Sequence, residues 1–192
     1  MCIRDRVLLV AAVRSPLAAS VRLGTVAGIA VLLVGCVVGF VMISNNSGIF
    51  QGTFGSGFTN RTAAYLGPDG STIGPEFLLI RPATDGGDLV LPHAIGVHGL
   101  VLLAVPAALL HRTGMTARRQ VQVVGTAVAA VVTALVILLV HAGRQLPLDQ
   151  LGPATLSALG LCGIALGAVY ASIGRSLIGR PDAVDHGTGS TG

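Results

Sequence analysis

The chain has 192 residues, of which 52% are apolar and only 10% are charged, and its mean hydropathy is +0.80. Because a soluble domain carries about 25% charged residues, this composition excludes an ordinary water-soluble fold and favours an integral membrane protein. The net charge of +4 comes from arginines spread along the chain, without a basic run interleaved with aromatic residues, so no nucleic-acid partner is predicted.

The first residues, MCIRDR, resemble translated sequencing adapter, so we expect residues 1–6 to be an artefact. The next seven residues, VLLVAAV, are apolar but too short to cross a membrane. We interpret residues 7–23 as the end of a truncated helix followed by a cytoplasmic loop. The alternatives are a short amphipathic start and a signal peptide; Arg14 directly after the apolar stretch argues against the latter.

Four apolar segments without Asp, Glu, Lys or Arg reach the length of about 20 residues that crosses a bilayer. They predict an all-α polytopic membrane bundle with four complete transmembrane helices, at residues 24–44, 91–110, 121–140 and 154–173. Two glycine pairs at GxxxG spacing, Gly35/Gly39 and Gly163/Gly167, are expected to pack helices together within the chain.

Arginine residues near the ends of the spans predict the orientation. In a four-span arrangement one side of the membrane receives Arg14, Arg22, Arg112, Arg118, Arg119, Arg175 and Arg180. We therefore expect loop 111–120 and the C-terminus to be cytoplasmic and loop 45–90 to be external. A basic complement made only of arginine, with abundant Ala, Gly and Val, is typical of a high-GC bacterial genome, which predicts the bacterial plasma membrane. The polar residues 181–192 are predicted to form a disordered tail.

The sequence between residues 67 and 100 contains GPDGSTIGPEF and then TDGGDLVLPHAIGVHGL. It resembles a pattern in uncharacterised multi-pass membrane proteins of actinobacteria and other bacteria, in which a PDG…GP loop precedes Gly-Asp-Leu and a helix with His-x4-His. The matching residues are Pro68, Asp69, Gly70, Gly74, Pro75, Gly87, Asp88, Leu89, His93, Gly96, His98 and Leu100. Two departures are the absence of Trp and Val101 in place of a glutamine. The resemblance implies a membrane location and no particular activity.

Three histidines are candidate cofactor ligands: His93, His98 and His141. At 1.5 Å per helical residue, His98 lies about 21 Å and His93 about 28 Å from Arg112, while His141 lies about 33 Å from the basic end of its own helix. Only His93 and His141 thus have similar depths and would suit a haem pair. A polar residue at membrane depth faces protein or a cavity, so we expect His98 to face the bundle interior. A structural hydrogen bond, to Gln122, Thr126 or Thr133, is the alternative.

A metal site at the external face would draw on Asp85, Asp88, His93 and His141, a mixture of carboxylate and imidazole that suits zinc, iron or copper. Asp88 has two further interpretations, since it can start the following helix or hold His93 in one tautomer. For His93 and His141 the alternative is an ordinary hydrogen bond to water or a backbone carbonyl.

The sequence contains no HExxH, no Ser/His/Asp arrangement and no paired carboxylates in the spans, and so predicts neither an enzyme nor a known cofactor. Three function classes remain. The first is a structural or accessory membrane protein, whose partners are the lipid bilayer and other membrane subunits. The second is a haem- or metal-binding redox protein that uses the external histidines. The third is a transporter or channel fragment.

Overall fold

The fold is a bundle of four long helices in a computed structural model that describes residues 16–46, 65–66, 87–146 and 148–178. The helices are α2 (Ala19–Asn46), α3 (Val90–His111), α4 (Ala117–Gly143) and α5 (Pro153–Ile178). All four are long and apolar enough to cross a membrane, which confirms the predicted all-α bundle with four spans. The predicted artefact, the truncated helix, most of loop 45–90 and the predicted tail lie outside the described residues.

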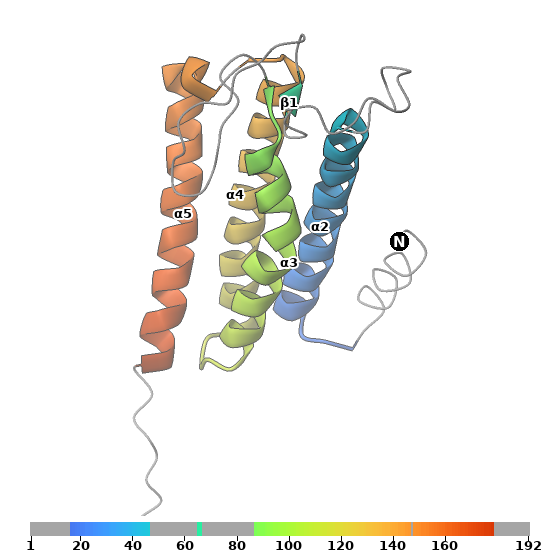
Figure 1. Cartoon of the computed structure of the whole chain (residues 1–192). Coiled ribbons are helices and arrows are strands. Elements are labelled where there is room, and N and C mark those ends of the chain that lie inside the picture. Colours follow the sequence, from blue (N-terminus) through green and yellow to red (C-terminus); the bar gives the residue numbers. More distant parts are fainter. Residues whose placement is uncertain (1–15, 47–64, 67–86, 147, 179–192) are drawn as a thin grey trace, which may run out of the picture.

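Short elements connect the helices at one end of the bundle. Strands β1 (Tyr65–Leu66) and β2 (Gly87–Asp88) pair antiparallel, and the 3-10 helix η2 (Leu148–Gln150) lies between α4 and α5. We call this the sheet end; it includes the start of α3, the C-terminal end of α4 and the start of α5 (Figure 1). The opposite end is called the arginine end. It carries Arg22, Arg112, Arg118, Arg119 and Arg175.

Local chemistry sets the ends of the helices at the sheet end. The carboxylate of Asp88 accepts the N–H of Val90, the first residue of α3, at 2.6 Å, as one interpretation of Asp88 predicted. At the end of α4 the backbone turns at Gln145, which has a left-handed φ of 57° and donates its N–H to the Ala142 carbonyl. Each helix contains the span expected for it and extends beyond it at both ends.

Helices α2 and α3 make the closest contact in the bundle, along a line of glycines. A β-carbon at Gly35 would lie 2.5 Å from the carbonyl carbon of Gly96, so the two backbones touch. Gly28 lies in the same way against Leu100, and Gly39 lies against the ring of His93. The Gly35/Gly39 pair therefore packs within the chain as predicted, because glycines let two membrane helices approach to backbone contact.

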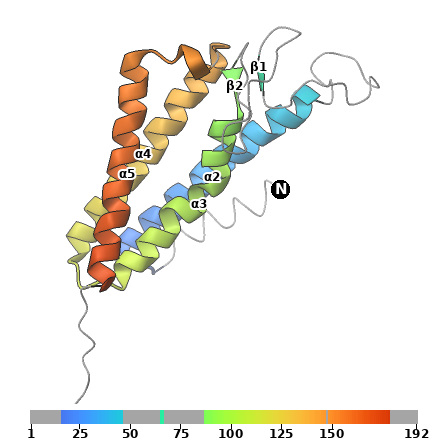
Figure 2. The same cartoon turned by 60° about the vertical axis from the view of Figure 1, so that its left-hand side comes forward.

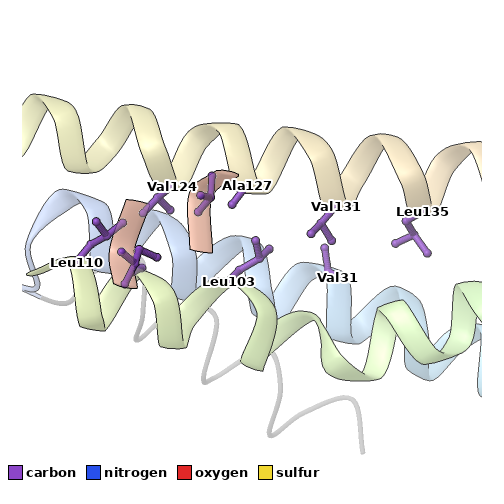
Figure 3. Close-up of a cluster of buried hydrophobic side chains, with 10 residues drawn as sticks. Val31, Leu103, Leu110, Val124, Ala127, Val131 and Leu135 are labelled. Carbon is purple, nitrogen blue, oxygen red and sulfur yellow. The ribbon is translucent and has the colours of Figure 1, made fainter. Parts of the chain in front are cut away.

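The main apolar core lies where α4 covers the α2–α3 pair. Figure 3 shows side chains of α4 directed toward α3 and α2. The buried members of this core are Val31, Leu103, Ala107, Leu110, Val124, Ala127, Val131, Leu135, Val169 and Ile173. Only the last two come from α5, so three helices supply most of the core.

Helix α5 is peripheral. It packs mainly beside α4 (Figures 1 and 2). Only 11% of its most apolar stretch is buried, against 39% for α4. Its buried side chains are Val169 and Ile173, both in its second half. The first half of α5 is thus the least enclosed part of the four spans.

A buried polar network ties α2, α4 and the α3–α4 connection together at the arginine end. Ser20 of α2 donates its hydroxyl to the side-chain carbonyl of Gln120 of α4 at 3.1 Å, and Gln120 donates its amide to the backbone carbonyl of Met115 at 3.0 Å. Both side chains are buried. Because each buried polar group has a partner, the network is compatible with the low dielectric around it.

Candidate functional site

His98 does not face the bundle interior, and the expectation that it does is wrong. Its side chain is exposed, and its Nδ1 lies 2.9 Å from the carbonyl oxygen of Ala94, one turn earlier in its own helix. The proposed partners are also directed elsewhere: Gln122, Thr126 and Thr133 are exposed, and Thr126 bonds to the Gln122 carbonyl of its own helix. The Ala94 carbonyl bonds one of the two ring nitrogens, so that nitrogen needs no partner on another helix.

His93 joins α3 to α2. Its Nδ1 lies 3.0 Å from the carbonyl oxygen of Gly35, and Gly39 leaves room for the ring. The ring thus fills a space that a larger residue at position 39 would occupy, since a β-carbon there would lie 2.7 Å from the His93 Cε1 atom. This geometry matches the interpretation of His93 as a hydrogen-bonded structural residue.

His141 lies on a different face. It is buried, with 9% of its surface exposed, and it lines an open groove of about 360 Å³ between α4 and α5 at the sheet end. His93, in contrast, contacts α2. The two histidines share the sheet end but contact different neighbouring helices, so the described residues do not turn them toward one common site.

The predicted metal site depends on a residue outside the described part of the chain. Among the described residues, no three His, Cys, Asp or Glu side chains form a group that could hold a metal ion. Asp88 is buried, with 2% of its surface exposed, and one carboxylate oxygen accepts the Val90 N–H. Asp85 is not described, so the four-residue set with Asp85 stays a prediction.

Sequence reasoning missed a cross-helix hydrogen bond of Tyr170. Pro106 lies inside α3 and has no N–H, so the carbonyl of Leu102, four residues earlier, loses its helical donor. The hydroxyl of Tyr170 on α5 donates to that carbonyl at 3.0 Å. The position of Pro106 in the sequence indicates that the Leu102 carbonyl needs a donor from elsewhere. Only the fold shows that α5 supplies that donor.

The Gly163/Gly167 pair was also misassigned. A β-carbon at Gly163 or Gly167 would meet no atom within 4 Å, and the same holds for Gly160 and Gly174 on the same helix. At 100° per residue these four glycines fall within about 60° of arc, opposite Val169. We call them the glycine face of α5. They do not pack helices within the described chain, so the expectation of intramolecular packing is wrong for this pair.

The described residues therefore offer two features with functional potential, the glycine face of α5 and the groove lined by His141, and no assembled catalytic or metal centre. Both features lie on α5 or beside it, on the side of the bundle that is least enclosed. Comparisons of the whole chain with models of protein families, with curated proteins and with solved structures found no match in any of the three.

Proposed function

We propose that this multi-pass membrane protein is an accessory subunit, and that α5 docks against a transmembrane helix of a different protein through its glycine face. The observation that supports this is the contrast between two sets of glycines. Glycines of α2 and α3 are covered by a neighbouring helix, whereas those of the glycine face meet nothing. The covered set is Gly24, Gly28, Gly35, Gly39, Gly96 and Gly99.

The energetic argument concerns what glycine contributes to a membrane helix. Each glycine in a helix interior costs about 1 kcal/mol relative to alanine. In a bilayer, small residues offset that cost when a second helix approaches closely and gains van der Waals contact. Four glycines on one exposed face thus favour helix docking over simple lipid contact. Ile164, which is 70% exposed, borders the same face and would add apolar contact.

The histidines give less support to the redox alternative. A haem-binding pair needs two histidine rings that face one common space, but the His93 ring lies against Gly35 and Gly39 of α2, whereas His141 lines the groove between α4 and α5. The accessory role instead requires only an unfilled helix face and a stable bundle behind it.

The test is site-specific photocrosslinking in membranes of the source cells. A photoreactive residue replaces Ile164 beside the glycine face, and the matched control replaces Val132, an exposed residue of α4. We expect a discrete protein adduct from position 164 and none from position 132. The double substitution of Gly163 and Gly167 by Leu should abolish the adduct because the bulky side chains block close approach.

The outcomes separate the alternatives. An adduct of twice the chain's mass would show self-association and would contradict the accessory role. Lipid adducts alone at position 164 would show that the glycine face contacts only the bilayer, and would overturn the proposal. A Gly125→Leu variant controls for glycine replacement in general, since Gly125 on α4 also meets no atom within 4 Å but stands apart from the glycine face.

A further inference from the structure

The groove between α4 and α5 combines apolar walls with one permanent cation. Val136, Val140 and Ala158 line its apolar part, and Arg144, His141 and Thr155 line its polar part. Its volume of about 360 Å³ lies within the range of roughly 300–1,000 Å³ that small-molecule pockets have. No carboxylate is among the described residues that line it.

The two parts of the groove are ordered along the membrane normal. Arg144 caps the C-terminal end of α4, its backbone N–H bonding to the Val140 carbonyl at 3.1 Å, so its guanidinium stands where the helix leaves the apolar core. Val140 and Val136 lie one and two turns deeper and are 49% and 51% exposed. The cation is therefore at headgroup depth, and the exposed valines are at acyl-chain depth.

The beginning of α5 adds to this electrostatic pattern. Ala154 and Thr155 line the groove and belong to the first turn of α5, where backbone N–H groups have no carbonyl one turn earlier. Such a terminus favours negative charge, although only as an adjunct to the guanidinium of Arg144. Asp149 lies in η2 between the two helices and is exposed, but it is not among the lining residues.

From this arrangement we infer that the groove is a binding site for an anionic phospholipid of the leaflet at the sheet end. The phosphate binds at Arg144 and Thr155, and one acyl chain lies along Val136, Val140 and Ala158. A guanidinium suits a phosphate because it can donate two parallel hydrogen bonds to it. Basic pockets between membrane helices recognise lipid headgroups by the same chemistry. This inference does not depend on docking at the glycine face of α5.

The experiment uses native mass spectrometry of the full chain released from detergent. Phosphatidylglycerol and phosphatidylcholine with identical acyl chains are added in equal amounts, and the ratio of the two bound lipids is measured. We expect the wild-type chain to prefer phosphatidylglycerol and Arg144→Gln to lower that ratio about tenfold, as loss of one charge-assisted contact implies. Arg175→Gln, at one of the exposed arginines of the arginine end, should leave the ratio unchanged.

A second variant tests the apolar part of the groove. Ala158→Phe fills the acyl-chain region and should reduce binding of both lipids while preserving their ratio. Because the lipid ratio and the fraction of chains with bound lipid are both measured on folded protein, a lower yield of either variant does not obscure them. Equal binding of the two lipids by the wild type, equal effects of Arg144→Gln and Arg175→Gln, or unchanged binding by Ala158→Phe would each overturn the site. If free glycerol phosphate competed as strongly as phosphatidylglycerol, the ligand of the groove would be a soluble phosphate compound and the assignment of a lipid would be wrong.

Discussion

Two residues of α3 show how a single polar group is satisfied inside this bundle. His98 was expected to need a partner on another helix, but the Ala94 carbonyl of its own helix is within 2.9 Å of its Nδ1. Ala94 and His98 are four residues apart in the sequence, so a hydrogen bond within one helical turn could have been predicted from the sequence. Leu102 shows the opposite case, since Pro106 removes its helical donor and α5 supplies Tyr170. Only the fold can say which distant residue donates.

Replacing Tyr170 by Phe should lower the free energy of unfolding by about 1 kcal/mol, because the Leu102 carbonyl then has no donor in a water-free environment. Denaturant-induced unfolding in mixed micelles measures this. Ser172→Ala is the matched control, since the Ser172 hydroxyl bonds at 2.7 Å to the Val169 carbonyl of its own helix, and it should have little effect.

A double-mutant cycle tests whether the stability lost in Tyr170→Phe comes from the Leu102 carbonyl losing its donor. Pro106→Ala restores an N–H that can serve the Leu102 carbonyl, so Tyr170→Phe should cost less in that background than in the wild type. Equal costs in the two backgrounds would show that the hydroxyl stabilises the bundle by some other contact.

At the scale of the helices, apolar length and charge were sufficient to predict four spans, since the bilayer itself imposes both requirements. They were not sufficient to predict which glycines pack. Gly35/Gly39 and Gly163/Gly167 share the same spacing, yet the first pair is covered by α3 and the second meets no atom within 4 Å. Spacing places two glycines on one face of a helix, but the face that a neighbour covers depends on how all four helices pack together.

Gly35→Ala should destabilise the chain by about 1–3 kcal/mol, because the new methyl group forces the α2 and α3 backbones apart. A β-carbon there would come within 2.5 Å of the Gly96 carbonyl carbon, and a backbone atom cannot move away as a flexible side chain can. Gly125→Ala is the control. It meets nothing within 4 Å and should be neutral or stabilising by up to about 1 kcal/mol through helix propensity. The unfolding free energies of both variants can be compared in one micelle system, and the same sign for both would contradict close packing at Gly35.

For the whole molecule, the distribution of arginines predicts the direction in which the bundle is threaded. Among the described residues the arginine end carries Arg22, Arg112, Arg118, Arg119 and Arg175, and the sheet end carries Arg144. The sequence predicts that the first five of these arginines lie on one side of the membrane, and in the fold they lie at one end of the bundle. That this end faces the cytoplasm rests on the charge rule.

Gly114 and Gly152 form a matched pair for testing the orientation, since both are exposed and have no atom within 4 Å of an added β-carbon. Gly114 follows α3 at the arginine end, and Gly152 precedes α5 at the sheet end. In a cysteine-free background, a membrane-impermeant maleimide applied to intact cells should label Gly152→Cys. It should label Gly114→Cys only after permeabilisation, and the reverse pattern would invert the predicted orientation.

The unequal supply of core residues by the helices has a consequence for how the protein is made. During synthesis α2, α3 and α4 emerge before α5, and α3 and α4 each pack against a helix made before them. Eight of the ten buried core residues are present once α4 has entered the bilayer, because only Val169 and Ile173 belong to α5. We therefore expect the first three helices to associate before α5 is complete. The last helix then packs onto a preformed surface, and its Tyr170 hydroxyl donates to the Leu102 carbonyl on that surface.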